Sequence, residues 1–494
     1  MSLAVVPSTQ EFPVFDGLDS GAAPGQLPWE ADAESESESE AVEAEAEAER
    51  EFEEDNTPFK LSIVADARDA MEARTSGGFY PRKPQSLAEA GLTRDFIEKL
   101  ICRALHVYGA ACGRRLAQGM GLPFRLIEPI LGELKAEMLL VYRKTAAAGD
   151  YEYVLSEAGS ERARRYMRIC EYAETAPVPL EDYVASVGVQ SLTLVTVGEE
   201  DLEAAFEDLL MEKGMLRRLG PAINAGRGMF LYGAPGNGKT SIAERVANCY
   251  GTDIWIPRTL LVDGVCVRLF DPVLHEVVAD EASALLGEPL EDARWVRIRR
   301  PTVVVGGELT MDQLEMRHDP VSNISEAPLQ MKSNCGVLLI DDFGRQTMPV
   351  AQLLNRWIVP LEKRYDFQKL PTGKKIQVPF DQLVVFSTNL VPKDLVDEAF
   401  LRRLPYKIEA VDPTPEQFLR IMMLVGPKLG IHPSEEQVKD LIDTHFIGAG
   451  RRMRCCHPRD ILLQVRSYCL YHRQPLAFTD EAVAFAIDNY FAVM

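Results

Sequence analysis

The residues best suited to chemistry form one glycine-rich stretch, Gly233-Ala234-Pro235-Gly236-Asn237-Gly238-Lys239-Thr240. Its spacing matches G-x-x-x-x-G-K-[ST], a loop whose backbone N–H groups cradle nucleotide phosphates. In such a loop Lys239 reaches the β- and γ-phosphates, and the hydroxyl of Thr240 binds Mg²⁺. The alternative is a Gly-rich turn that matches by chance. It is disfavoured because an apolar run at 229–232 precedes the loop and a helical pattern at 241–250 follows it.

Two further apolar runs end in polar side chains. The run 337–340 ends in Asp341 and Asp342, which predicts carboxylates at the tip of a buried strand. Asp341 would hold the Mg²⁺ shell and Asp342 would orient the attacking water, whereas a simple strand-end turn is the alternative. The run 383–386 leads to Asn389, which either positions water near the γ-phosphate or caps the next helix.

A pair of arginines follows in chain order. Arg402 and Arg403 come directly after a short helical stretch and before the apolar pattern at 406–410. Paired arginines at such a place suit an arginine finger, which reaches the γ-phosphate of a neighbouring subunit. The alternative is a surface ion pair. The alternation of helix and strand patterns over 201–412 predicts a parallel α/β sheet, with ligands bound at the carboxyl ends of its strands.

Taken together, these motifs resemble the AAA+ ATPase family over about residues 195–490. The resemblance implies ATP and Mg²⁺ as ligands and a nucleotide site that extends from the loop to Ser241. It implies a helical lid at 413–494 in which Arg459 takes the place of the family's sensor arginine, with Arg451, Arg452 and Arg454 as alternatives. It also implies a homo-oligomeric ring, a hexamer, that remodels an unidentified client protein.

The chain departs from the family pattern at several places. The second acid after the strand is Asp342, where the family usually has Glu. The separation of Lys239 from Asp341 is also longer than usual, and the excess contains an expected hairpin at 259–270 with an Asp-Gly turn. The stretch 370–380 is either a second hairpin or a surface loop. The glycines of 304–307 lack the aromatic residue of a pore loop, which leaves peptide threading without support.

Residues 57–190 resemble a winged helix-turn-helix module. Helical patterns cover 93–108, 110–118 and 124–138, strand patterns cover 139–142 and 151–155, and a last helix is expected at 160–170. The third helix of such modules often enters the major groove of DNA. Here that helix carries Arg125 and Lys135 against three glutamates, so docking to a protein is the favoured alternative to DNA binding.

The composition of the chain limits its class. The 494 residues are 46% hydrophobic, without a run of 18 apolar residues, so no membrane span is expected. Nine cysteines without a C-x-x-C pair indicate free thiols in a reducing compartment, and we expect a cytoplasmic protein. Residues 1–55 carry 17 acids and one base, so they hold most of the net charge of −22. This segment is predicted to be a disordered, solubilising tail, or alternatively a nucleic-acid mimic.

The predicted fold class is therefore α/β. A disordered acidic tail at 1–56 and a winged-helix-like α+β domain at 57–190 precede an AAA+ P-loop parallel sheet at 191–412 and a helical lid at 413–494. Two other functions remain open at this point. One is a DNA-associated, ATP-dependent regulator, and the other is a nucleotide switch or adaptor that does not hydrolyse its ligand.

Overall fold

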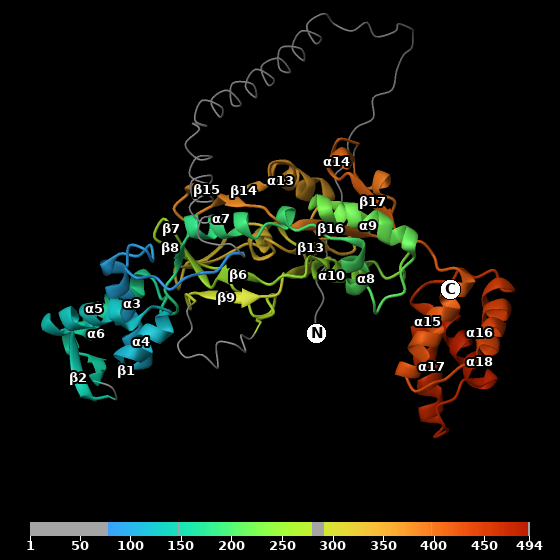
Figure 1. Ribbon diagram of the computed structural model, residues 1–494, viewed down its shortest axis with the longest axis horizontal. Helices are drawn as coiled ribbons and strands as arrows, with labels where there is room; N and C mark the ends of the chain where they lie inside the picture. Colours follow the sequence, from blue (N-terminus) through green and yellow to red (C-terminus); the bar gives the residue numbers. More distant parts are fainter. Residues whose placement is uncertain (1–77, 147–148, 279–290, 397, 493–494) are drawn as a thin grey trace, which may run out of the picture. The chain divides into compact units, whose positions relative to one another are not determined.

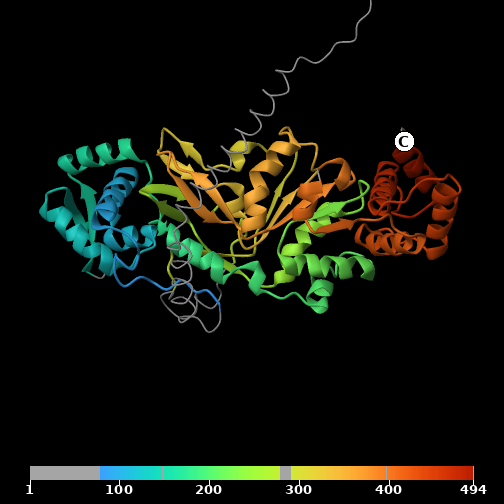
Figure 2. The same cartoon turned by 90° about the horizontal axis from the view of Figure 1, so that it is seen from above.

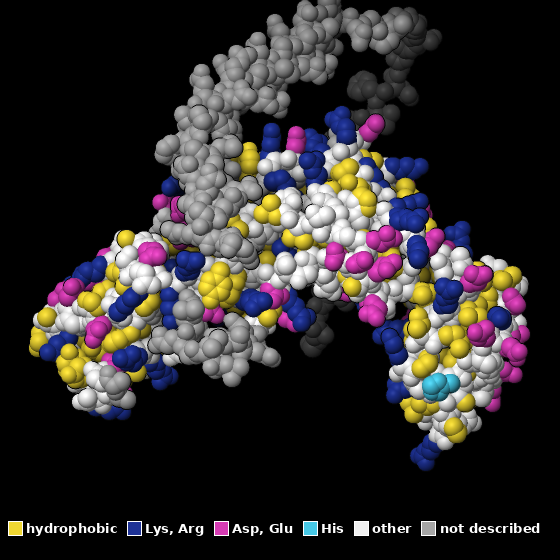
Figure 3. Space-filling view, in the orientation of Figure 1, with side chains coloured by type: hydrophobic (Ala, Val, Ile, Leu, Met, Phe, Trp, Pro, Cys, Tyr) yellow, Lys and Arg dark blue, Asp and Glu magenta, His cyan; other side chains and the backbone are white. Residues whose placement is uncertain are grey.

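A computed structural model describes residues 78–146, 149–278, 291–396 and 398–492 (Figure 1). The predicted acidic tail at 1–56 lies outside the described residues. On the face seen in Figure 3, acidic and basic side chains are interspersed over most of the surface. None of the helices in the described part of the chain is long and apolar enough to cross a membrane.

The first folded part of the chain, here called the N-terminal module, combines helices with a small antiparallel sheet. The sheet has the strand order β1-β3-β2. The elements are α3 (Arg94–Tyr108), β1 (Ala110–Cys112), α4 (Gly113–Met120), α5 (Phe124–Ala136), β2 (Leu140–Thr145), β3 (Tyr151–Leu155) and α6 (Glu157–Ile169).

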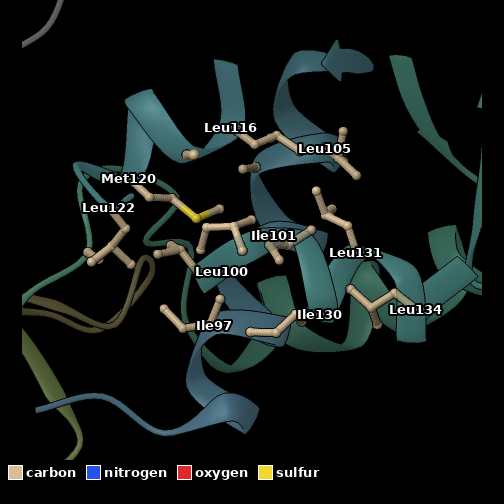
Figure 4. Close-up of a cluster of buried hydrophobic side chains, with 14 of the residues drawn as sticks. Ile97, Leu100, Ile101, Leu105, Leu116, Met120, Leu122, Ile130, Leu131 and Leu134 are labelled. Atoms are coloured by element: carbon tan, nitrogen blue, oxygen red, sulfur yellow. The ribbon is translucent and has the colours of Figure 1, made fainter. Parts of the chain in front are cut away.

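Helical spacing places the apolar side chains of this module inside it. Thr93 caps α3 as predicted, because its side chain accepts a hydrogen bond from the N–H of Phe96 at 3.2 Å. Figure 4 shows the side chains of α3 meeting those of α4 and α5 in one cluster; its labelled members are Ile97, Leu100, Ile101, Leu105, Leu116, Met120, Leu122, Ile130, Leu131 and Leu134.

One prediction for this module is wrong. Residues 110–112 were expected to start the second helix, but they form β1 and pair with β3, Ala110 opposite Val154. Alanine is the strongest helix former, but helix propensity is a weak preference, and pairing with a neighbouring strand overrides it here. Gly109, with φ 76°, ends α3 just before this strand, so the helix cannot continue through it.

The central domain is built on a five-stranded parallel sheet. Its strand order is β10-β13-β16-β5-β17, and every neighbouring pair is parallel. The strands are β5 (Met229–Tyr232), β10 (Thr302–Val305), β13 (Val337–Ile340), β16 (Leu383–Thr388) and β17 (Tyr406–Glu409). The helices of this domain are α8 (Glu199–Ala205), α9 (Lys213–Ala225), α10 (Lys239–Val246), α12 (Leu329–Lys332), α13 (Val350–Lys363) and α14 (Glu398–Arg403).

Both faces of this sheet are buried, which explains why its strands read as continuous apolar runs. Alternate residues of one strand enter different cores: Leu339 packs with the side chains of α9 and α10, while Leu338 packs with those of α13. The domain is thus a parallel α/β sheet with helices on both faces (Figure 1).

The long connection between α10 and β13 supplies four strands of a second sheet, here called the inserted sheet, and its fifth strand, β4, comes earlier in the chain. Its order is β11-β12-β8-β7-β4. Its strands are β4 (Val178–Pro179), β7 (Thr259–Val262), β8 (Val265–Arg268), β11 (Arg317–Asp319) and β12 (Ile324–Glu326), beside the pair β6 (Ile254–Pro257) and β9 (Trp295–Ile298). The predicted Asp-Gly hairpin is confirmed, since Asp263 and Gly264 connect β7 to β8 with φ 52° and 83°.

Two further elements adjoin this region. The helix α7 (Leu180–Val189) falls inside the predicted N-terminal domain, but its Tyr183 is buried among inserted-sheet residues and donates a hydrogen bond to the carbonyl of Met331 at 3.1 Å. Of the two alternatives for 370–380, the hairpin is the one observed, but it begins earlier than expected, with β14 (Tyr365–Lys369) paired to β15 (Lys375–Pro379). Short 3-10 turns lie at Leu192–Leu194, Ala247–Tyr250, Met311–Gln313 and Pro392–Asp394.

The C-terminal helical domain follows β17. It consists of α15 (Pro415–Lys428), α16 (Glu435–Leu441), a π-helical turn at Ile442–Ile447, α17 (His457–Tyr471) and α18 (Asp480–Phe491), packed around one core (Figure 2). Thr414 and Gln417 form a reciprocal cap that starts α15 at the predicted place. Most of the predicted core is buried, but Phe485 is 48% exposed and rests on Tyr468.

Candidate active site

The glycine-rich loop joins β5 to α10, as predicted. Gly233, Gly236 and Gly238 have φ angles of 140°, 84° and 76°, which side chains rarely adopt. At Gly233 a Cβ would also lie 2.5 Å from the carbonyl oxygen of Ala410, so only glycine fits beside β17. The backbone therefore turns tightly enough for its N–H groups to face one anion at the start of α10.

The side chain of Lys239 folds back over this loop. Its Nζ donates to the carbonyl oxygens of Gly233 (3.0 Å) and Ala234 (3.1 Å) and to Oδ1 of Asn389 (2.7 Å). Burial lowers the pKa of Lys239, while the carboxylates of Asp341 and Asp342 oppose that shift. The ammonium group is thus held at the loop by three neutral oxygens, a weaker set of partners than phosphate offers.

Thr240 and Asp341, the two residues predicted to hold Mg²⁺, contact each other. Oγ1 of Thr240 donates to Oδ2 of Asp341 at 2.7 Å. The sheet order explains their meeting, because β13 and β5 both flank β16 and end at the same edge. A hydroxyl and a carboxylate suit Mg²⁺, which takes few protein ligands and keeps water and phosphate oxygens for the rest. Among the described residues no cluster of three or more His, Cys, Asp or Glu side chains could hold a metal.

Asp342 occupies a left-handed backbone conformation. Its φ is 48°, and its N–H donates to Oδ1 of Asp341 at 2.9 Å. Its own Oδ1 accepts a hydrogen bond from Nδ2 of Asn389 at 3.1 Å. Because Asn389 also accepts from Lys239, a hydrogen-bonded series runs from Lys239 through Asn389 to Asp342. This series connects the loop to the second carboxylate.

Gln346 is a neighbour of the site that the sequence did not reveal. Its Nε2 lies 3.2 Å from the carbonyl oxygen of Asp341 and 3.3 Å from that of Asp342. Its Oε1 accepts from the N–H of Gly344 at 2.8 Å. One amide side chain therefore satisfies three backbone groups of the turn and holds Asp342 in its unusual conformation. No sequence motif marks a turn-bridging glutamine.

The loop also contacts the C-terminal helical domain. Nδ2 of Asn237 donates to the Ala410 carbonyl oxygen (3.1 Å) and to Oδ1 of Asp412 (2.8 Å). The guanidinium of Arg454 pairs with the same Asp412 carboxylate. The N–H of Cys456 donates to the carbonyl oxygen of Gly236 at 2.9 Å. We call Gly236, Asn237, Asp412, Arg454 and Cys456 the C-terminal latch.

The pKa values of Asp412, which belongs to the latch, and of His457, which follows it, are both lowered. Burial opposes ionisation of Asp412, but hydrogen bonds from Asn237 and Arg454 outweigh it, so the pKa of Asp412 lies below its ordinary value. His457 follows the latch at the start of α17, and its Nδ1 accepts from the N–H of Arg454 at 3.1 Å. Burial, reinforced by the Arg454 charge, lowers the pKa of His457 to about 4.

The remaining predicted residues are three arginines outside the hydrogen-bonded series and three residues of the loop and of α10. Arg459 has an exposed side chain on the first turn of α17, whereas Arg454, one of the predicted alternatives for the sensor, belongs to the latch. Arg403 lies 3.6 Å from Glu362, and Arg402 is exposed. Ser241 lies in the first turn of α10, and Ala234 and Pro235 form the outer part of the loop.

Comparisons with known proteins match parts of this chain. Residues 414–489 match a family described as a domain of unknown function (DUF8689), which covers the C-terminal helical domain alone. A search of curated protein sequences gave no match.

Solved structures give weak similarities. A point mutant of RuvB from Thermotoga maritima is 13% identical with a TM-score of 0.32, over 61% of this chain and 72% of that one. A RuvB structure from the same organism, described as a Holliday junction branch migration motor, is 14% identical with a TM-score of 0.32, over 59% of this chain and 70% of that one. NtrX from Brucella abortus is 12% identical with a TM-score of 0.35, and the similarity spans 59% of each chain. At identities and TM-scores this low, the similarities carry no inference about function.

Proposed function

We propose that this protein is an AAA+-type ATPase, which binds Mg-ATP at the glycine-rich loop and hydrolyses its terminal phosphoanhydride bond. The observation that supports this most is the hydrogen-bonded series Lys239–Asn389–Asp342, which adjoins the Thr240–Asp341 pair at one edge of a parallel sheet. A lysine, a hydroxyl, two carboxylates and an amide are the groups that phosphoryl transfer uses for positioning and charge stabilisation.

Each group has a distinct role in this proposal. The backbone N–H groups of the loop and the ammonium of Lys239 bind the β- and γ-phosphates. Mg²⁺ held by Thr240 and Asp341 supplies charge neutralisation on the phosphate oxygens. Asp342 orients the attacking water and accepts its proton, and Asn389 keeps the Asp342 carboxylate in place while contacting the γ-phosphate.

The proposal extends to assembly and partners. Arg402 is exposed and no described side chain pairs with it, so it is the first candidate to serve the γ-phosphate of a neighbouring copy, with Arg403 as the second. We assign a homo-hexameric ring in the cytoplasm that remodels a client protein complex. In that scheme the C-terminal helical domain acts as the lid, and Arg454, in preference to Arg459, senses the nucleotide.

Phosphate release by the purified full chain tests the hydrolysis. Lys239→Ala is expected to abolish nucleotide binding, whereas Asp342→Asn is expected to bind ATP and to lose about 10²-fold or more in turnover. Lys213→Ala and Asp312→Asn change an exposed lysine and an exposed aspartate and serve as matched controls. Unchanged hydrolysis in either site variant contradicts the proposal. Tight ATP binding without turnover in the wild-type chain identifies a nucleotide switch instead.

The assembly is tested by the dependence of activity on protein concentration. Specific activity is expected to rise with concentration if sites are shared between copies. Arg402→Ala or Arg403→Ala should lower turnover while leaving ATP affinity nearly unchanged, because the arginine acts on the site of a neighbour. Equal specific activity at all concentrations, with both variants active, contradicts the ring.

A second candidate function is a DNA-associated regulator. The observation that favours it lies on the N-terminal module, where Tyr142 and Tyr151 stack at 4.2 Å and Lys135 lies 4.9 Å from the Tyr142 ring centre. Arg143 and Lys144 are exposed on the same edge strand, β2. Basic side chains beside exposed aromatic rings suit a nucleic acid.

Duplex DNA binding at several salt concentrations tests this second function. The double variant Arg143→Gln/Lys144→Gln is expected to weaken binding and to reduce its salt dependence. The control, Arg466→Gln/Arg473→Gln, removes the same charge from exposed positions of the C-terminal helical domain. An equal loss in both variants, or no binding by the wild-type chain, excludes a DNA-binding β2 edge.

A further inference from the structure

A hollow in the surface lies away from the glycine-rich loop and shares no residue with it. Its volume is about 310 Å³, and it is lined by side chains of the N-terminal module, the segment that follows it and the inserted sheet. Its main polar and aromatic lining residues are Tyr108, Glu174, Arg258, Thr259, Arg268 and Phe270. The sequence patterns did not single out any of these residues for function.

The strands of the inserted sheet fix the basic side chains of this hollow. Thr259 and Arg268 lie directly opposite each other in the β7–β8 ladder. Arg258 stands immediately before β7, and its carbonyl oxygen accepts from the N–H groups of Leu269 and Phe270, both at 3.1 Å. Arg258, Thr259 and Arg268 therefore converge from a rigid backbone.

The lining of the hollow holds two positively charged side chains, Arg258 and Arg268, and one negatively charged side chain, Glu174. Arg268 is paired with Glu174 at 2.5 Å, so the carboxylate of that lining residue is used. No described carboxylate or other hydrogen-bond acceptor pairs with the Arg258 guanidinium, which lies 5.3 Å from the Phe270 ring centre. Burial lowers the pKa of Arg258, with no carboxylate opposing the shift. Arg258 is half-buried, so part of its hydration is lost without a counter-ion, and an anion in the hollow would offset that cost.

The lining presents hydrogen-bond donors that suit an anion. Arg258 brings a planar fork of N–H donors that matches carboxylate and phosphate oxygens. Tyr108 adds a hydroxyl at the rim, where its side chain is exposed, whereas the hydroxyl of Thr259 is hydrogen-bonded to Tyr172 of the same lining. We propose that this hollow, the Arg258 pocket, binds a small anion carrying a phosphate or carboxylate group, with Arg258 as its main ligand.

Phosphate binding to the full chain tests the pocket, provided that the glycine-rich loop is controlled for. Equilibrium dialysis with labelled inorganic phosphate is therefore done in the Lys239→Ala background. Adding Arg258→Gln is expected to weaken the remaining binding about tenfold or more, as expected for hydrogen bonds to a charged group. Adding Arg317→Gln instead, an exposed arginine of the same inserted sheet, is expected to leave it unchanged.

The outcomes separate this pocket from the proposed ATPase site. Loss of phosphate binding with Lys239→Ala alone overturns the pocket and leaves the ATPase proposal intact, whereas binding that survives Lys239→Ala but not Arg258→Gln supports the pocket. Equal effects of Arg258→Gln and Arg317→Gln overturn it. If Arg258→Gln does not fold, hydrogen exchange of the Lys239→Ala chain provides the test. Added phosphate should slow exchange in peptides covering 256–270. The absence of any slowing overturns the pocket.

The source of the anion is distinguished with a second probe. A synthetic peptide of residues 34–55, which carries the glutamates of the acidic segment, is added to the phosphate-loaded chain. Displacement of phosphate assigns the pocket to a carboxylate of this chain's own acidic segment. Retention of phosphate assigns it to a free anion.

Discussion

The left-handed backbone at Asp342 leads to a specific prediction about the choice of acid. The φ of 48° is one that Asp and Asn tolerate better than other side chains, because their short polar groups bond locally. Glu lacks this advantage and should cost about 1 kcal/mol at this position. Asp342→Glu should therefore melt about 2–4 °C below the wild-type chain, the shift expected for a domain of roughly 200 residues.

The same substitution should not improve catalysis. An added methylene moves the carboxylate from the place where Asn389 donates to it at 3.1 Å. Misplacement of a catalytic group by about 1 Å can cost about 10²-fold, so Asp342→Glu is expected to hydrolyse more slowly than wild type. Asp342→Asn keeps the backbone preference and removes the charge, so it should keep the melting temperature and lose turnover.

Thermal melting and phosphate release on the two variants and wild type measure both effects. Asp312→Glu lengthens an exposed aspartate in an ordinary backbone conformation and serves as the control. A variant Asp342→Glu that is as stable as wild type and turns over equally fast refutes the reasoning, because neither backbone strain nor carboxylate position would then matter.

Three further predictions concern the C-terminal latch. Gly236→Ala would place a Cβ 2.5 Å from Sγ of Cys456, whereas Gly238→Ala meets nothing within 4 Å, so calorimetric ATP titration should show a larger loss of affinity for Gly236→Ala. Equal losses of ATP affinity in the two variants would mean that the strain of a side chain at a positive φ matters and the contact with Cys456 does not. Asp412→Asn removes the ion pair of the latch. If the latch holds the segment 452–460, the free energy of opening that hydrogen exchange measures in its peptides should fall by about 1.5–3 kcal/mol. His457 has a pKa of about 4 when folded against 6.5 ordinarily, so the unfolded chain binds its proton more readily. The contribution of His457 to the free energy of unfolding of the C-terminal helical domain should be fully present above about pH 6.5 and fall by about 3 kcal/mol towards pH 4. Hydrogen exchange at several pH values measures this, and His457→Gln should reduce the dependence on pH.

The glycine-rich loop and the strand ends around it could be predicted because their signals are local. A contiguous motif gave Lys239 and Thr240, and apolar runs ending in polar residues gave Asp341, Asp342 and Asn389. Parallel strands buried on both faces produce such runs, and their carboxyl ends meet at one edge, so the order of motifs along the chain was enough to expect the cluster.

The contacts that the sequence did not reveal join distant residues or depend on backbone angles. Asn237 meets Asp412 across 175 positions, and no periodicity reports such a pairing. Arg454, one of the predicted alternatives to Arg459, lies in the latch because α17 begins at His457, which leaves Arg454 before the helix and Arg459 exposed on its first turn. Gln346 was missed because its role depends on the φ of Asp342.

The loop carries two hydrogen-bond networks that share its backbone and no side chain. One runs from Lys239 through Asn389 to Asp342, and the other joins Gly236 and Asn237 to the C-terminal latch. A phosphate that draws Lys239 from the carbonyl oxygens of Gly233 and Ala234 acts on the same short loop that the latch holds. Coupling between sites is reciprocal, so a substitution that loosens the latch must change nucleotide affinity by the same factor by which nucleotide changes latch stability. Asp412→Asn, which touches no residue of the Lys239–Asn389–Asp342 series, is therefore the variant in which this equality can be measured without disturbing the chemistry.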